Sequence, residues 1–188
     1  MKYHFEFYKK AYYDEIEELI FNSYQWENPI FGLSRFEFGI GLHPAFLQYP
    51  DAWERTVGVY FLNGTIVACA INEGNDSGEA FFLFKNKNYA EDEELLNDMI
   101  HFAITTMVHV KEDRIHRFIR ILALEWNQVL SNKLLTLGFV KEAGERNLIR
   151  RFESKPYPVV LPEGYSIVDG NTAPAFFCCK CPYGCFFL

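Results

Sequence analysis

The sequence lacks an excess of positive charge and any long run of apolar residues. Of its 188 residues, 18 are lysine or arginine and 25 are aspartate or glutamate, which gives a formal net charge of −7. Surfaces that bind nucleic acid are basic because they neutralise phosphates, so this balance predicts no nucleic-acid partner. No segment approaches the roughly 20 apolar residues that a membrane-spanning helix needs, and we expect no membrane partner.

The sequence also lacks a secretion signal and a disulfide framework. Residues 1–10, MKYHFEFYKK, alternate charged and aromatic side chains and contain no apolar run of the signal-peptide type. Cys69 stands alone in an apolar stretch, and the other cysteines all follow residue 177. Because a disulfide-stabilised protein spreads its cysteines through the fold, these features predict a cytoplasmic protein.

The clustered cysteines close the chain in an unusual tail. They are Cys178, Cys179, Cys181 and Cys185. Their spacing is not the paired C-x-x-C of zinc sites and there is no second ligand pair, so we expect no metal site. We interpret the tail as foreign to the preceding fold, as would follow from a shift of reading frame.

A strong hairpin signal lies in the first half of the chain. Residues 56–62 and 65–71 are rich in β-branched and aromatic side chains and flank Asn63-Gly64. This dipeptide is typical of a tight hairpin because both of its residues adopt positive φ angles. Residues 79–84 form a further apolar run, so the sequence predicts an antiparallel meander of three strands.

Helical and strand signals alternate on both sides of this meander. Capping residues and apolar periodicity predict further strands at 2–8, 117–124, 139–142 and 147–152 and helices at 14–23 (capped by Asp14), 34–42, 91–109 and 127–137 (ended by Gly138). The order predicts an α/β fold with a mixed, mostly antiparallel, twisted sheet and helices on both faces. The step from 79–84 to 117–124 is expected to be a parallel crossover.

Residues 121–139, ILALEWNQVLSNKLLTLGF, resemble the last strand–helix unit of the GNAT N-acetyltransferase superfamily. Asn127, Gly138 and Phe139 fit the family spacing N-x-x-A-x-x-L-Y-x-K-x-G-F. The hairpin VGVYFLNGTIVACAI and the strand GEAFFLF, which leads into a helix, match at the corresponding places. The resemblance covers residues 1–153 and implies a GNAT-like acyltransferase domain.

Residues 154–162 contain three prolines and read as a linker. Residues 161–168, LPEGYSIV, resemble the opening strand of another GNAT domain. The layout is therefore similar to a tandem GNAT protein, in which residues 163–188 hold the truncated start of a second domain together with the cysteine-rich tail.

The resemblance implies acetyl-CoA as cofactor and an amine of a small molecule or peptide as acceptor. In the family, backbone groups after the fourth strand bind the pantetheine arm, which maps to Leu83, Phe84 and Lys85. The family's helix-opening Asn maps to Asn127. Its side chain also suits a helix N-cap, which explains the residue without any ligand.

Two positions depart from the family pattern. Leu134 stands where many active members have a Tyr that protonates the leaving thiolate. The turn at residues 85–94 has no glycine and places four consecutive acids where the family binds pyrophosphate. Without glycine the backbone folds less closely around a phosphate, and like charges repel it.

Two interpretations apply to each group of candidate catalytic and acceptor-binding residues. Glu73, Glu79 and Glu125 are candidates for a general base, which needs a raised pKa and a water path, or they are solvated surface carboxylates. An aromatic group could wall an acceptor pocket, or it forms core or a subunit contact. Its members are Trp26, Phe36, Trp53 and Tyr60, with His43 beside them.

Two functions follow. One is a GNAT acetyltransferase that carries a degenerate cofactor site in this domain. The other is a catalytically silent GNAT-like domain that acts as a structural or regulatory partner of an active second domain, so that acetyl-CoA does not bind this half. In the second case we expect self-association or packing with a second GNAT domain, because the docking face is exposed. The fold does not select the acceptor.

Overall fold

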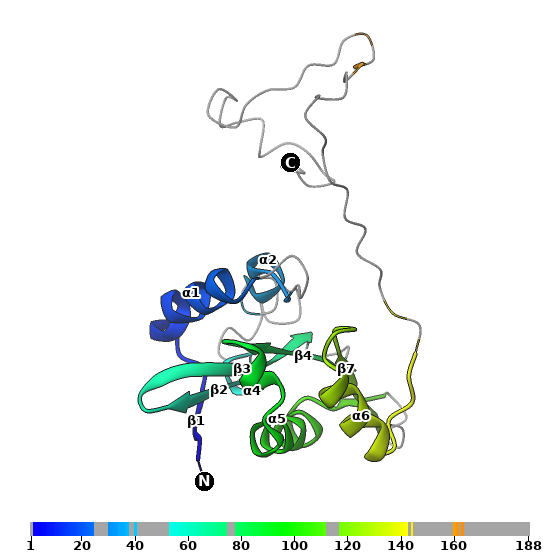
Figure 1. Cartoon of the computed structure of the whole chain (residues 1–188). Coiled ribbons are helices and arrows are strands. Elements are labelled where there is room, and N and C mark those ends of the chain that lie inside the picture. The colour runs from blue at the N-terminus through cyan, green and yellow to red at the C-terminus, as the bar shows by residue number, and fades with distance from the viewer. Residues whose placement is uncertain are drawn as a thin grey trace. The chain divides into compact units, whose positions relative to one another are not determined.

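The computed structural model describes residues 2–24, 30–37, 40, 53–74, 78–111, 117–142, 144, 160, 161 and 163 (Figure 1). The chain divides into two units, Met1–Glu142 and Ala143–Leu188. The described elements all belong to the first unit. The predicted linker, second-domain start and cysteine-rich tail lie almost entirely outside the described residues.

The first unit is built on a mixed sheet in the order β1-β2-β3-β4-β7. The strands are β1 (His4–Phe7), β2 (Val57–Leu62), β3 (Thr65–Gly74), β4 (Glu79–Phe84) and β7 (Arg120–Leu122). Neighbours from β1 to β4 are antiparallel, and β4 pairs with β7 in parallel. The mostly antiparallel α/β fold and the parallel crossover are therefore confirmed. A separate pair joins β5 (His109–Val110) to β6 (Arg117–Phe118).

The predicted hairpin is present between β2 and β3. Asn63 and Gly64 have φ angles of +52° and +78°, as the turn requires. A register shift opposite Tyr60 and Phe61 leaves Val67 as an extra residue in β3. A second shift, against β4, does the same to Glu73 near the end of β3. Each shift is a bulge that re-aims the following side chain.

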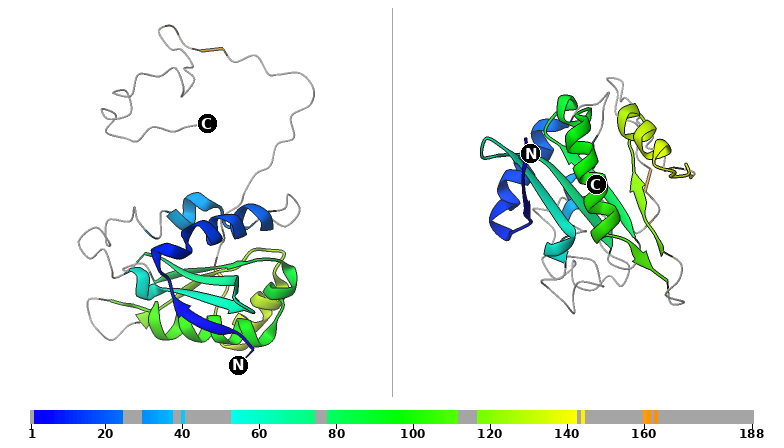
Figure 2. Two further views of the ribbon diagram at one scale, coloured as in Figure 1. Left: turned by 90° about the vertical axis from the view of Figure 1, so that its left-hand side faces the viewer. Right: turned by 90° about the horizontal axis from the view of Figure 1, so that it is seen from below.

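Helices cover both faces of the sheet, with α1 and α2 on one side and α5 and α6 on the other (Figures 1 and 2). The helices are α1 (Tyr13–Ser23), α2 (Leu33–Glu37), α4 (Lys87–Ala90), α5 (Glu93–Thr106) and α6 (Gln128–Thr136). Two 3₁₀ helices, η1 (Lys10–Tyr12) and η3 (Trp53–Thr56), precede α1 and β2.

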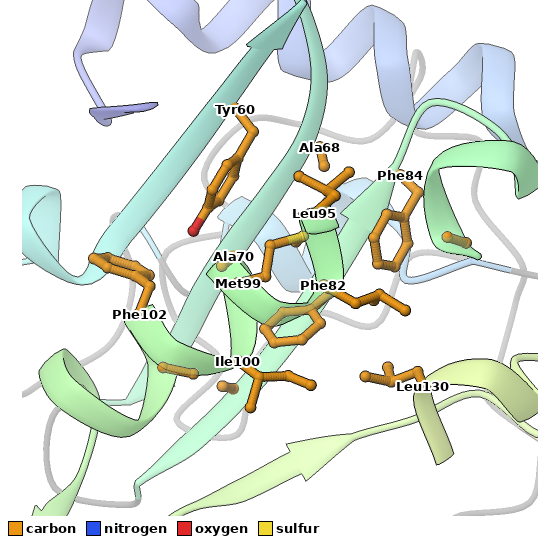
Figure 3. Close-up of a cluster of buried hydrophobic side chains, with 14 of the residues drawn as sticks. Tyr60, Ala68, Ala70, Phe82, Phe84, Leu95, Met99, Ile100, Phe102 and Leu130 are labelled. Carbon is orange, nitrogen blue, oxygen red and sulfur yellow. The ribbon is translucent and has the colours of Figure 1, made fainter. Parts of the chain in front are cut away.

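Alternation along the strands divides the buried side chains into two cores. The core under α1 and α2 contains Ile16, Phe36, Val59, Cys69, Phe81 and Leu83, among others. The opposite core contains Tyr60, Ala68, Ala70, Phe82, Phe84 and the apolar face of α5 (Figure 3). Burial of one large apolar side chain contributes about 1.5–3 kcal/mol, so these two layers dominate stability. Cys69 is 0% exposed in the central strand, and burial raises the pKa of its thiol.

Local details depart from the sequence predictions. Asp14 does not cap α1: the helix is preceded by η1, and its N-cap Tyr12 makes no side-chain cap bond. The Tyr13 N–H instead donates to the Lys10 carbonyl. The long helix predicted from residue 91 begins at Glu93, after the separate helix α4.

The predicted short helix at 34–42 is α2 in its described part. Residues 139–142 form no strand in the described part of the chain, and the partner segment 147–152 lies outside it.

Candidate functional site

Strands β4 and β7 diverge after their last paired residues. We call the space between them the wedge. Their parallel ladder runs through Glu79–Arg120 and Ala80–Ile121 and ends at the pair Phe81 and Leu122. Beyond that pair β4 continues to Phe84. Across the wedge, the chain that follows β7 turns into α6.

The backbone hydrogen bonds of β4 show which groups face the wedge. The Lys85 N–H donates to the Val67 carbonyl at 2.8 Å, and Leu83 lies opposite Cys69 in the same ladder. On the other side, the Gly78 carbonyl accepts from the Arg120 N–H at 2.7 Å. Even-numbered residues of β4 therefore turn their backbone groups toward β7. Of Leu83, Phe84 and Lys85, Phe84 alone faces the wedge.

The protein's own side chains fill the wedge. It is lined by Ile30, Phe31, Phe82, Phe84, Leu122, Leu124, Trp126, Asn127 and Leu130 and retains a cavity of about 10 Å³. This is close to the smallest space that holds one water molecule. The rings of Phe82 and Phe84 meet edge-on at 6.3 Å, and Leu130 of α6 lies on the same side (Figure 3). Phe84 is 7% exposed.

Asn127 acts as the N-cap of α6. Its Oδ1 accepts a hydrogen bond from the Leu130 N–H at 3.0 Å, and the residue is buried. At the other end of the helix, Gly138 adopts φ of +88°, and the Phe139 N–H donates to the Leu134 carbonyl at 3.1 Å. This is the Schellman arrangement, which confirms the predicted helix stop. Leu134 is buried in the α5-side core and has no group that can carry a proton.

Asp92, in the turn before α5, is held by several hydrogen bonds. Asp92 caps α5 through the Leu95 N–H at 3.0 Å and is also bound by Lys2 Nζ at 2.6 Å and the Tyr3 hydroxyl at 2.9 Å. Burial of the Asp92 carboxyl raises its pKa, but these hydrogen bonds outweigh burial and hold the pKa below its usual range. A carboxylate therefore already lies at the N-terminus of α5, where the helix dipole favours an anion, and it accepts the Leu95 N–H.

The three candidate bases occupy separate places. Glu73 Oε2 lies 2.6 Å from Nη2 of Arg35 in α2. Glu79 Oε1 lies 3.5 Å from Nη1 of Arg120 at the start of the β4–β7 ladder. Glu125 lies exposed in the turn before α6. Two of the three carboxylates are therefore engaged with arginines.

Two of the predicted acceptor-pocket aromatics, Phe36 and Tyr60, lie on opposite faces of the sheet. Phe36 is fully buried in the α1–α2 core, where its ring lies 6.0 Å from that of Tyr8. Tyr60 is buried on the opposite face, 5.3 Å from the ring of Phe5. These two side chains form core. Trp53 begins η3, and Trp26 and His43 lie outside the described residues.

A larger hollow, of about 280 Å³, lies beside the turn before α5. It is lined by Lys2, Tyr3, Leu62, Asn86, Asn88, Tyr89 and Asp92. Sequence reasoning missed it because its walls come from three distant segments that carry no common motif. Within the described ranges there is no group of three or more His, Cys, Asp or Glu residues suited to a metal ion. None of the helices described is both long and apolar enough to cross a bilayer.

Comparison with protein-family models, with curated proteins and with solved structures gives no match for this chain.

Proposed function

We propose that Met1–Glu142 is a catalytically silent GNAT-like domain that acts as the structural or regulatory partner of an active acetyltransferase domain. The GNAT part of this proposal rests on the sequence pattern around Asn127 and Gly138 and on the order of elements. The parallel pairing of β4 with β7, which stops at Phe81 and Leu122, fits the place where the family binds pantetheine.

The filled wedge carries the silent part of the proposal. Ligand pockets typically measure about 300–1,000 Å³, whereas the wedge retains about 10 Å³. An acyl-pantetheine arm would have to displace Phe84 or Trp126 from the wedge. Loss of such contacts costs several kcal/mol, which the arm would have to regain by binding.

Two further features support the same conclusion. The Asp92 carboxylate already accepts the Leu95 N–H at the start of α5, so a pyrophosphate placed there would meet this negative charge. Leu134 offers no proton to a leaving thiolate. These features lie on different elements and lead independently to the same result.

Calorimetric titration of the full chain with acetyl-CoA tests the proposal. We expect no heat of binding up to millimolar ligand and no acetyl transfer to a panel of amines, while an active GNAT enzyme run in parallel gives both. Micromolar binding of acetyl-CoA together with transfer would overturn the proposal.

The second candidate function is an acetyl-CoA-dependent N-acetyltransferase acting on a small-molecule or peptide amine. One observation favours it: the backbone of Phe84 faces the wedge beyond the last ladder pair, as a pantetheine-binding strand requires. The titration separates the two, since this function demands saturable binding of acetyl-CoA.

A further inference from the structure

The outermost strand of the sheet, β1, turns hydrogen-bonding groups outward. It is terminal in the strand order and pairs with β2 alone in that sheet. The Tyr8 N–H donates to the Val57 carbonyl at 2.9 Å, and the register of β1 on β2 continues from this pair. Even-numbered residues of β1 therefore bond to β2, and Phe5 and Phe7 direct their N–H and C=O groups away from the sheet.

An aromatic patch lies directly beside this edge. The patch consists of Phe5, Phe7 and Phe102, whose ring centroids are 5.1 to 6.1 Å apart. Phe5 is 36% exposed and Phe7 is 47% exposed. Natural edge strands are often protected by Pro, Lys or a bulge, which the sequence HFEF of β1 lacks, and its protection is limited to its length of 4 residues and the charge of Glu6.

The opposite face of β1 carries charge that is balanced locally. Glu6 Oε1 lies 3.0 Å from His4 Nε2, and Lys9 and Tyr12 bind the other carboxylate oxygen. One face of the strand is therefore aromatic, and the other is polar without a surplus of one sign. A strand of this kind is complementary to an antiparallel copy of itself.

We propose that β1 pairs antiparallel with β1 of a second copy, with Phe5 opposite its own counterpart on the two-fold axis. The two sheets then form one continuous sheet, and the aromatic patches of both copies are covered. The interface is isologous and closes as a dimer. It lies at the end of the sheet opposite the wedge, so this proposal stands whether or not the proposed function does.

The charges select the register. Because the outward groups belong to odd-numbered residues, the shared ladder pairs odd with odd. Two such registers place both phenylalanines opposite aromatic residues. With Phe5 opposite Phe5, His4 lies opposite Glu6. With Phe5 opposite Phe7, the two Glu6 carboxylates lie opposite each other, which is unfavourable.

Sedimentation equilibrium of the full chain under reducing conditions tests the proposal. We expect a concentration-dependent monomer–dimer equilibrium. Phe7→Lys should raise the dissociation constant at least about tenfold, because it places a charge in the aromatic patch. The matched control Phe21→Lys changes an exposed phenylalanine of α1 and should leave dissociation unchanged. A monomer at all concentrations, or equal effects of the two variants, would overturn the proposal.

Two further comparisons test the backbone pairing and its register, with thermal melts to show that each variant folds. Phe7→Pro should weaken the dimer more than Phe7→Ala, since only proline removes the outward N–H, which the β2 ladder does not use. His4→Glu should weaken the dimer severalfold relative to His4→Gln, because a carboxylate then faces Glu6. Equal dissociation constants within either pair would refute the interface in this form.

Discussion

Arg35 Nη2 lies 2.6 Å from Oε2 of Glu73, and this ion pair ties α2 to the bulge near the end of β3. The guanidinium also lies over the rings of Phe31 and Phe81, at 5.2 and 5.8 Å from their centroids. The carboxylate that sequence reasoning offered as a base is therefore part of a largely buried structural contact.

Replacement of Glu73 should weaken the fold. We expect Glu73→Gln to lower the free energy of unfolding by about 1–2 kcal/mol, because it removes the charge from a hydrogen-bonded pair. Urea denaturation measures the change. Glu125→Gln, on an exposed turn, serves as control and should stay within about 0.5 kcal/mol of the parent. Equal effects of the two variants would contradict a structural role for the ion pair.

Gly58 of β2 leaves room for two aromatic rings. A Cβ at this position would lie 2.8 Å from Phe5 Cε2 and 2.9 Å from Phe102 Cε1. Gly58→Ala should therefore destabilise the protein by about 1–3 kcal/mol through overpacking. Gly32→Ala is the matched control, since a Cβ there meets no atom within 4 Å. Thermal melts of both variants measure the change in stability. A Gly58→Ala variant as stable as the parent would show that the two rings move aside freely.

The cap at Asn127 can be separated from a ligand role. Asn127→Ala should cost about 1 kcal/mol of stability, whereas Asn127→Ser should cost less because serine also caps helices. Chemical denaturation of both variants gives the comparison. If alanine and serine destabilised equally, capping would not be what the side chain contributes.

From the lowered pKa of the Glu6 carboxyl, we expect the protein to lose stability in acid. Hydrogen bonds from Lys9, Tyr12 and His4 lower its pKa from 4.5 to about 2. A lowered pKa in the folded state stabilises the protein above the unfolded value, and this contribution disappears as the pH falls from about 4.5 to about 2. Urea midpoints of the parent and Glu6→Gln should therefore differ at pH 7 and converge near pH 2. A constant difference across this range would exclude the linkage.

Under the proposed function, a tyrosine at position 134 should not confer acetyl transfer. Leu134 is 6% exposed and packs in the α5-side core. Leu134→Tyr should therefore cost about 1–3 kcal/mol by overpacking, and acetyl transfer should remain undetectable because the wedge stays filled. Denaturation and a transfer assay on the same preparation measure both outcomes. Transfer activity in this variant would contradict the proposed silent domain.

The sequence predicted those features that neighbouring residues determine. Asn63-Gly64 specifies its turn through positive φ angles, and Gly138 ends α6 for the same reason. The apolar run at residues 79–84 located β4 at its observed bounds, and the order of strands and helices then led to the correct α/β class.

The missed features depend on contacts between distant segments. Lys2 binds Asp92 across 90 residues of sequence, and Arg35 reaches Glu73 across 38. No local sequence pattern indicates such pairs, so neither the hydrogen bonds of Asp92 nor the ion pair of Glu73 could be predicted. The filled wedge likewise depends on side chains from β4, β7 and α6 that meet in space, which composition does not specify.

The buried thiol of Cys69 can serve as a chemical probe of how often the fold opens. Its thiol is fully buried in the middle strand, and its raised pKa keeps it protonated at neutral pH. An alkylating reagent reaches this sulfur only when the sheet opens, because alkylation requires an exposed thiolate and a buried thiol is inert. The rate of Cys69 labelling, resolved from the tail cysteines by peptide mass, therefore reports how often the structure around β3 opens under native conditions.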